Sequence, residues 1–246
     1  MIERILDLSK IEAGKLELAH ESFDLHQLMH AVISIFEVQS RQKGVRLDLY
    51  LDPEVPFALL GDPRRLKQIL MNMIGNAIKF TEKGSVTVTV GLIDKSEQKG
   101  RLSFCIRDTG IGMSEDKQTR IFNRFTQADS TITRRFGGTG LGTTIAKNLT
   151  ELMGGNISLE SREDEGSSFF ITLPFDLSTE NPRSKELSRL HILLLGEQVE
   201  AKRMASLMQH WGTSITLIED EKLLLSCLVD AWSMGQPFDV LMVHRS

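Results

Sequence analysis

The chain has 246 residues, and its hydrophobic content of 41% suffices for one large or two modest domains with a buried core. The formal net charge is only −4, with both signs spread along the sequence, which argues against a nucleic-acid-binding protein held by phosphate contacts. No apolar stretch reaches the roughly 18 residues of a membrane-spanning helix and no signal peptide opens the chain, so we expect a cytoplasmic protein.

The N-terminal third predicts three helices and one strand. Apolar residues at helical spacing predict the end of a helix in residues 2–18, and the N-cap residue Asp24 predicts a second helix that ends near Gly44. Alternating apolar residues predict a half-buried strand at 45–51. An aspartate followed by a proline predicts that a third helix begins at Pro63.

The middle of the chain predicts two hairpins separated by a long loop and a helix. Strands are expected at 86–90, 102–106, 157–159 and 169–173. The stretch 109–136 has poor periodicity, with a short helix near 116–125, and loops of this length are uncommon unless they are functional. A helical stripe follows at 141–152. We therefore predict an α+β fold, with helices on one face of a mixed sheet.

The C-terminal part predicts a second, smaller unit. A polar stretch that contains Pro182 predicts a linker at 177–189. Beyond the linker, the alternation of strands with helices predicts a parallel sheet that is buried on both faces. Its strands are expected at 190–195, 215–218 and 238–243, and its helices end near His210 and Met234.

The helix from Pro63 to Phe80 carries an unusual polar side. On a helical wheel its apolar residues gather on one side, whereas Asn72, Asn76 and Lys79 lie on the other. A solvated surface is one interpretation of this side. However, asparagine costs about half a kcal/mol against alanine inside a helix, and a merely wet surface favours Glu, Lys or Gln. An amide oxygen suits Mg²⁺ that also binds phosphate, so a ligand site is the other interpretation.

Two glycine-containing segments are further candidate sites. In the segment "RDTGIGMS", Asp108 ends a strand, and Gly110 and Gly112 would let the backbone approach a flat ligand, although a bare turn explains the pattern as well. In "FGGTGLGTTIA", four glycines precede a helix whose first N–H groups are unpaired and carry the positive end of the dipole. That arrangement favours an anion site over a flexible entry loop.

Four motifs in this order, "NMIGNAIKFT", "DTGIG", "IFNRFTQADSTITRRFGGTGLGTTIA" and "GSSFFITLP", resemble the catalytic ATP-binding domain of sensor histidine kinases of the hybrid phosphorelay kind. That domain belongs to the wider gyrase, heat-shock chaperone and mismatch-repair ATPase superfamily, and the resemblance spans about Phe23 to Phe175. It implies a Bergerat-type α+β sandwich that binds ATP and Mg²⁺ under a mobile lid.

The resemblance also implies roles for individual residues. Asn76 would coordinate Mg²⁺, Asn72 would stand near the γ-phosphate, and Lys79 would contact phosphate, so that Asn72 and Lys79 are the candidate catalytic residues. Asp108 would hold the adenine amine. The base pocket would be lined by Gly110, Gly112 and Met113, and the triphosphate would be wrapped by Gly138, Thr139, Gly140, Leu141 and Gly142. Arg134 and Arg135 would reach the triphosphate from the lid, although a solvated loop charge explains at least one of them. Phe122 and Phe125 match a phenylalanine box that moves with the lid.

The sequence departs from the family pattern in two places. Thr143 and Thr144 stand where the family usually has Leu-Ala, which we expect to be tolerated. In addition, "ILDLSKIEAGKLEL" resembles the second dimerisation helix of these kinases, but the helix with the phosphoacceptor histidine is absent, and none of the six histidines has that context. We therefore expect that the chain binds ATP but cannot phosphorylate itself.

The C-terminal part resembles the first half of a response-regulator receiver domain, a flavodoxin-like parallel α/β fold. Receivers place an acidic pair after the first strand and a phosphorylated aspartate after the third. Here those places hold Gly196-Glu197 and Val243-His244, so we expect a degenerate receiver. Because the chain ends after the third expected strand, we also expect an incomplete sheet with an apolar edge.

These interpretations predict four segments: the end of a dimerisation helix at 1–22, an ATP-binding catalytic domain at 23–176, a linker at 177–189 and a partial receiver at 190–246. The predicted activity is transfer of the γ-phosphoryl of ATP to a histidine outside this chain. Expected partners are the dimerisation and phosphoacceptor helices of the parent kinase, which we expect at the inner membrane, and receiver or response-regulator proteins. A homodimer through the N-terminal helix or the open sheet edge is a further expectation. An ATPase that works as a conformational clamp, and a non-catalytic interaction module, stay open as alternatives.

Overall fold

The computed structural model describes residues 13–122, 141–178, 187–196 and 199–244, and the chain divides into two units, Met1–Thr179 and Glu180–Ser246. Within the described residues, no helix is both long and apolar enough to cross a membrane.

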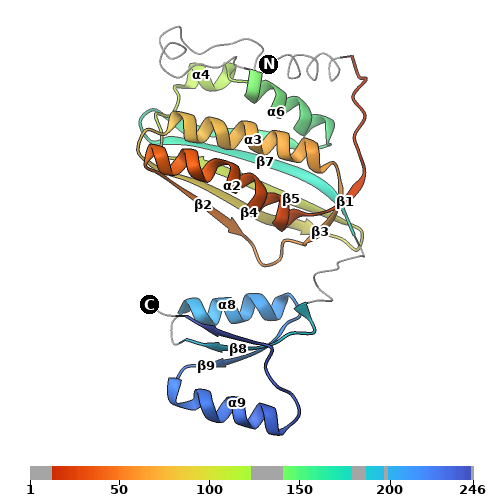
Figure 1. Ribbon diagram of the computed structural model, residues 1–246. Helices are drawn as coiled ribbons and strands as arrows, with labels where there is room; N and C mark the ends of the chain where they lie inside the picture. The colour runs from red at the N-terminus through yellow and green to blue at the C-terminus, as the bar shows by residue number, and fades with distance from the viewer. Residues whose placement is uncertain (1–12, 123–140, 179–186, 197–198, 245–246) are drawn as a thin grey trace. The chain divides into compact units, whose positions relative to one another are not determined.

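The first unit is built on a seven-stranded mixed sheet (Figure 1). Its order is β1 (Glu21–Asp24), β3 (Ala58–Gly61), β7 (Gly166–Leu177), β5 (Lys99–Asp108), β4 (Gly84–Lys95) and β2 (Val45–Leu51), and β6 (Asn156–Arg162) also pairs with β7. The strands β2 and β4 run parallel, whereas the other neighbours are antiparallel. The mixed sheet predicted from the alternating segments is therefore confirmed.

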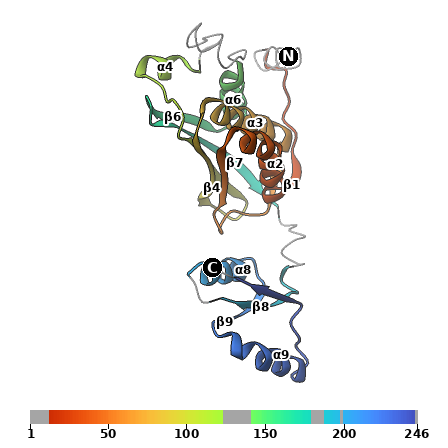
Figure 2. The ribbon, with the colours of Figure 1, turned by 60° about the vertical axis from the view of Figure 1, so that its left-hand side comes forward.

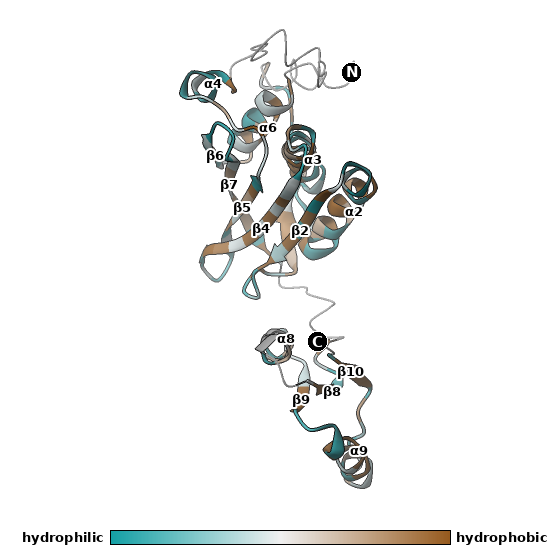
Figure 3. Ribbon diagram, turned by 90° about the vertical axis from the view of Figure 1, so that its left-hand side faces the viewer, coloured by the Kyte–Doolittle hydropathy of each residue, from teal (hydrophilic) through white to brown (hydrophobic). Residues whose placement is uncertain are grey.

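Helices cover one face of this sheet. The helices α2 (Leu25–Lys43), α3 (Pro63–Phe80) and α6 (Leu141–Leu152) pack through their apolar residues into the core, and Figure 3 shows α2 and α3 on the same side of β2, β4 and β5. A shorter helix, α4 (Glu115–Arg120), follows β5. The predicted α+β architecture with helices on one face is confirmed.

Aspartates begin both long helices, as the sequence predicts. The Asp24 carboxylate accepts a hydrogen bond from the backbone N–H of Gln27, and Asp62 accepts from the N–H groups of Arg64 and Arg65. The second oxygen of Asp62 also accepts from the N–H of Ala19, in the segment that precedes β1. Capping of this kind satisfies N–H groups that a helix cannot pair internally, so it fixes where α3 begins.

The sequence analysis missed the two strands β1 and β3. Each has four residues, too few to show a period, and both lie at one edge of the sheet, where β1 pairs only with β3 among the described residues. The predicted linker of 177–189 is also wrong at its start, because Leu177 is the last residue of β7 and pairs with Leu59.

The second unit contains a parallel sheet of three strands in the order β10 (Val240–Val243), β8 (His191–Leu195) and β9 (Ser214–Ile218). Apolar residues of α8 (Val199–His210) pack on one face of β8, and those of α9 (Leu224–Ser233) pack on the other (Figure 2). The short 3₁₀ turn Glu221–Leu223 precedes α9.

The parallel arrangement of this sheet confirms the prediction, but burial on both faces holds only for the central strand β8. On the edge strand β10, Val240, Leu241 and Val243 are 36%, 45% and 50% exposed. Among the described residues this edge strand pairs only with β8, and its apolar side chains are less covered by α8 and α9 than those of β8.

Candidate functional site

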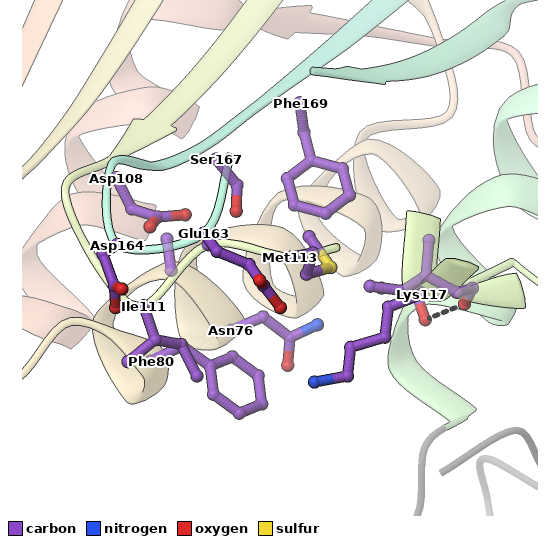
Figure 4. A pocket seen from close by; sticks show the side chains of 14 residues that line it. Asn76, Phe80, Asp108, Ile111, Met113, Lys117, Glu163, Asp164, Ser167 and Phe169 are labelled. Carbon is purple, nitrogen blue, oxygen red and sulfur yellow. Dashed lines mark hydrogen bonds between the residues drawn. The ribbon is translucent and has the colours of Figure 1, made fainter. Parts of the chain in front are cut away.

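A cavity of about 420 Å³ lies at one end of α3 (Figure 4). Its walls come from the C-terminal turn of α3, the loop that follows β5, the turn between β6 and β7, and the helices α4 and α6. The lining residues are Asn76, Ala77, Phe80, Asp108, Ile111, Gly112, Met113, Lys117, Ile121, Thr143, Glu163, Asp164, Ser167 and Phe169. Residues more than 80 positions apart in the sequence thus share one pocket.

The two asparagines of α3 face the beginning of α6. Asn72 is buried, and Asn76, one helical turn later, lines the cavity. A Cβ atom placed on Gly142, in the first turn of α6, would lie 3.6 Å from Asn72 Oδ1 and 3.7 Å from Asn76 Nδ2. The amide-bearing side of α3 and the glycine at the mouth of α6 therefore converge. The solvated interpretation of this side is wrong for Asn72.

Lys79 is not one of the residues that line the cavity, but it follows them closely on α3. Its ammonium stands 4.7 Å from the ring centroid of Phe80, which does line the cavity. Burial lowers the pKa of Lys79, because desolvation disfavours the charged form.

Asp108, the last residue of β5, is buried and lines the cavity. Its Oδ1 accepts a hydrogen bond of 2.9 Å from the N–H of Gly110. Burial raises the pKa of the Asp108 carboxyl, while hydrogen bonds from the backbone N–H groups of Gly110 and Ser167 partly oppose this shift. A buried acceptor that opens into a cavity favours the ligand interpretation of this segment over a bare turn.

The loop after Asp108 is held between α3 and the β6–β7 turn. The N–H of Ile111 donates to the Phe80 carbonyl at 3.3 Å, and the Ile111 carbonyl accepts from the N–H of Asp164 at 2.9 Å. Gly112 has a φ of +61°, and a Cβ atom there would overlap the carbonyl oxygen of Arg162. Only glycine allows this close approach of two backbones.

Sequence analysis missed several of the lining residues. Glu163 and Asp164 form a hairpin turn that carries no signal of a site in the sequence, and Lys117 lies on the short helix α4. In Figure 4 the Glu163 side chain extends toward the centre of the pocket, and the end of the Lys117 side chain lies near Asn76. The cavity therefore has carboxylates on one side and an ammonium on another.

The two threonines that depart from the family pattern are both buried on α6. The Thr143 hydroxyl donates to the Ile121 carbonyl at 2.9 Å, so it ties α6 to the segment after α4. Next to it, the Phe122 ring packs edge-on against Phe169 with centroids 6.4 Å apart. This contact covers part of the Phe122 ring, which is half-buried, and the movement of Phe122 with a lid stays a prediction.

The structure also brings Met113 into the lining and buries Leu141 at the first position of α6. Gly110 lies beside the lining, where a Cβ atom would overlap the Phe80 carbonyl oxygen. Several predicted site residues lie outside the described residues: Phe125, Arg134, Arg135, Gly138, Thr139 and Gly140. In the part of the chain that is described, no three His, Cys, Asp or Glu side chains gather in a way that could hold a metal ion.

Residues 61–177 match the family described as histidine kinase-, DNA gyrase B- and HSP90-like ATPases. This segment contains both asparagines, Asp108, α6 and the β6–β7 turn, which are the parts that form the cavity. Residues 61–177 thus form a domain of this ATPase family. The family assignment drawn from the four sequence motifs is confirmed, and ATP is the ligand class that the family name implies for the pocket.

The matching relatives are much longer than this chain. The signal transduction histidine-protein kinase BarA of Escherichia coli is 44% identical over 178 residues, which are 72% of this chain and 19% of BarA. The sensor histidine kinase AruS of Pseudomonas aeruginosa is 37% identical over 224 residues, which are 89% of this chain and 22% of AruS. The chain therefore spans about a fifth of the length of these curated relatives.

A solved structure resembles nearly the whole chain. The crystal structure of full-length ShkA in complex with AMPPNP superimposes with a TM-score of 0.65 and 27% sequence identity. The match covers 98% of this chain and 48% of the ShkA chain. Taken with the curated relatives, this likeness identifies the ATPase domain of the first unit as one of the histidine kinase type.

Proposed function

We propose that the first unit binds ATP with Mg²⁺ and positions the γ-phosphoryl group for transfer to a histidine outside this chain, as the catalytic domain of a hybrid sensor histidine kinase. One observation carries this proposal: Gly142 in the first turn of α6 lies close to Asn72 and Asn76 of α3, and Asn76 lines a cavity that also contains Asp108. A helix N-terminus, two amides and a buried carboxylate suit the phosphate and adenine ends of one nucleotide.

At the base end, the Asp108 carboxylate would accept a hydrogen bond from the exocyclic amine of adenine. The glycines at 110 and 112 keep the backbone close to the plane of the base, and Met113 and Phe80 supply apolar contacts in the cavity. A carboxylate there disfavours a base that presents a carbonyl at the position of the amine. Two acceptor oxygens would then face each other with no hydrogen between them.

At the phosphate end, Leu141 and Gly142 begin α6, whose dipole favours negative charge. Arg135, Gly138, Thr139 and Gly140 would complete the phosphate site. Lys79, beside Phe80, would approach the phosphates from α3.

The residues present fit a magnesium ion. Mg²⁺ prefers oxygen ligands, retains several waters and is usually held by few protein groups together with phosphates, so an amide oxygen of Asn76 is a suitable donor and a cluster of carboxylates is not required. When bound, Mg²⁺ would neutralise part of the phosphate charge. The chain's own contribution is then to orient the nucleotide through Asn72, Asn76 and Asp108.

An amide at position 72 supports phosphoryl transfer over hydrolysis. Asn72 is buried and its side chain cannot accept the proton of an attacking water, so it does not provide a general base. In a kinase the acceptor side chain takes the place of that water. We therefore propose that the acceptor histidine belongs to the dimerisation and phosphoacceptor helices of the longer parent kinase. Residues 1–22 of this chain would be the end of the second dimerisation helix, and the catalytic domain at 23–176 follows it.

For the second unit we propose a degenerate receiver that follows the linker. Gly196 comes directly after β8, and His244 comes directly after β10 and donates its N–H to the Leu195 carbonyl. A Cβ atom on Gly196 would stand 3.2 Å from the Cβ of His244, so these two positions are neighbours at the carboxyl end of the sheet. Neither offers a carboxylate that could accept phosphate.

Substitution of Asn76 tests the proposed function most directly. We expect that Asn76→Ala lowers the affinity for a non-hydrolysable ATP analogue by about tenfold in the presence of Mg²⁺ and changes it little in its absence, because only the metal-dependent contact is lost. Isothermal titration of both proteins with and without Mg²⁺ measures this difference.

The matched control is Gln68→Ala, which removes an amide from the same helix two turns earlier, away from the cavity. The control should retain the metal dependence of the parent chain. No nucleotide binding by the unsubstituted chain would refute the proposed function, and an unchanged metal dependence in Asn76→Ala would refute the role of Asn76.

The pH dependence of binding tests the role of Asp108. Because the pKa of its carboxyl is raised, the group takes up a proton at a higher pH than an ordinary aspartate. A protonated carboxyl is the weaker acceptor for an amine, so nucleotide affinity should fall as the pH decreases through that raised value. Titrations from neutral pH down to the acid limit of the folded protein, with the parent chain and with Asp108→Asn, measure this.

We expect Asp108→Asn to bind more weakly at neutral pH and to lack this additional acid-dependent loss. The nucleotide's own protonation affects both proteins alike, so the ratio of their affinities isolates the carboxyl at position 108. A ratio that stays constant over the whole pH range would contradict the assignment of Asp108 to the adenine amine.

A further inference from the structure

The C-terminal turn of α3 forms a wall of the cavity, and the carbonyl groups at its end each have a named partner. The Ala77 carbonyl accepts from the N–H and the hydroxyl of Thr81, at 3.1 and 2.8 Å. The Phe80 carbonyl accepts from the N–H of Ile111 in the loop that lines the cavity. The last four carbonyls of a helix lack partners within the helix, so these bonds decide how the turn is held.

The two remaining carbonyls, of Ile78 and Lys79, share one donor from another helix. The ammonium of Lys43 donates to both, at 2.7 Å each. Lys43 is the last residue of α2, and the left-handed Gly44 that follows ends the helix, which leaves the lysine side chain directed at the end of α3. An ammonium group at the C-terminus of a helix is also favoured by the helix dipole.

The surroundings of the ammonium indicate a specific contact and not a surface side chain that happens to lie nearby. Desolvation by burial lowers the pKa of Lys43, and the negative charge of Glu82 opposes this effect. Desolvation is unfavourable for an ammonium unless hydrogen bonds to oxygen atoms compensate for it, and here two carbonyls provide them.

We propose that Lys43 is a positioning residue of the nucleotide site: by joining α2 to the last turn of α3, it holds Asn76 and Phe80 and, through the Phe80 carbonyl, the loop at Ile111. This inference rests on the proposed function for its effect on nucleotide binding. Lys43 itself is not part of the cavity wall, so it acts only through the turn that it fixes. Removing its charge and donors would leave two helix-end carbonyls without this partner.

Three substitutions of Lys43 separate charge, donors and packing. Lys43→Met keeps the length of the side chain but removes the charge and the hydrogen-bond donors. Lys43→Gln keeps a donor without the charge, and Lys43→Arg keeps the charge and the donors. We expect the affinity for AMPPNP to fall by about tenfold in the Met variant and about threefold in the Gln variant, and to stay within about twofold of the parent value in the Arg variant.

The control is Ser40→Ala, one turn earlier on α2. Ser40 is buried and donates to the Val45 carbonyl at the start of β2, so its loss destabilises the same end of α2 without releasing α3. Thermal unfolding of each protein shows how far stability is affected. A merely structural role for Lys43 predicts that the control lowers AMPPNP affinity as much as Lys43→Met does at equal destabilisation.

Hydrogen exchange gives a second measurement that needs no nucleotide. The N–H of Ile111 should exchange about tenfold faster in Lys43→Met and as slowly as in the parent chain in Ser40→Ala, because only the former frees the turn that accepts this bond. If Lys43→Met does not fold, Lys43→Gln carries the test. Unchanged affinity together with unchanged exchange at Ile111 in a folded variant would overturn the inference. Failure of the parent chain to bind AMPPNP would instead overturn the proposed function, while the exchange measurement would still decide the positioning role.

Discussion

Replacement of Gly112 by alanine is expected to weaken the binding of an ATP analogue by about 100-fold. Gly112 has a φ of +61°, a conformation that costs an L-residue about 1 kcal/mol or more. In addition, the new Cβ would overlap the carbonyl oxygen of Arg162, so the backbones at 112 and 162 must separate. Both belong to segments that line the cavity, since Gly112 lies in the lining and the turn after Arg162 contributes Glu163 and Asp164.

The matched control for this change is Gly14→Ala. Gly14 has a φ of +62°, so the backbone penalty is the same, but nothing lies within 4 Å of the added methyl group. Titration calorimetry with AMPPNP and thermal unfolding should therefore separate the two effects. We expect comparable backbone strain in both variants and a loss of affinity in Gly112→Ala alone. Equal affinities in the two variants would show that the cavity tolerates separation of its two walls.

The parts of the fold that sequence analysis predicted are those defined by local rules. The helices α2 and α3 have long apolar periods and begin at Asp24 and Asp62, whose side chains bond N–H groups two or three residues away. Such signals need no knowledge of the rest of the chain. The four-residue strands β1 and β3 lack a period, and they become strands only because β7 extends far enough to pair with β3.

The sequence predicted those residues of the candidate site whose type is unusual at their position. It did not predict the residues that reach the site only through tertiary packing. Asn72 and Asn76 stood out because asparagine is unfavourable inside a helix, and Asp108 because it ends a strand before two glycines. Glu163 reaches the cavity only because the β6–β7 turn packs against the loop at Gly112, and Lys117 reaches it from the separate helix α4. Lys43 is ordinary in sequence, since a lysine in the last turn of a helix is common, and its bond to α3 depends on tertiary packing.

Replacement of Phe104 by alanine should cause the largest loss of stability, about 3 to 5 kcal/mol in the free energy of unfolding. Phe104 lies in the middle of β5, is 0% exposed, and belongs to the core formed between the sheet and its helices. Its strand neighbours Val90 and Ile171 are also buried, so the structure around it has little freedom to close the cavity that the change creates.

Phe170 provides the matched control because it is the same residue type on the neighbouring strand β7, where it faces away from the helices and is 38% exposed. Its cross-strand partner on β5 is Cys105. Phe170→Ala should lower the free energy of unfolding by about 1 kcal/mol or less, since much of the ring already contacts water. Urea unfolding followed by circular dichroism measures both changes. The two tryptophans, Trp211 and Trp232, lie in the second unit and report separately on its unfolding by fluorescence. Similar losses for Phe104→Ala and Phe170→Ala would mean that both faces of the sheet are covered, which would contradict a core confined to the side of α2, α3 and α6.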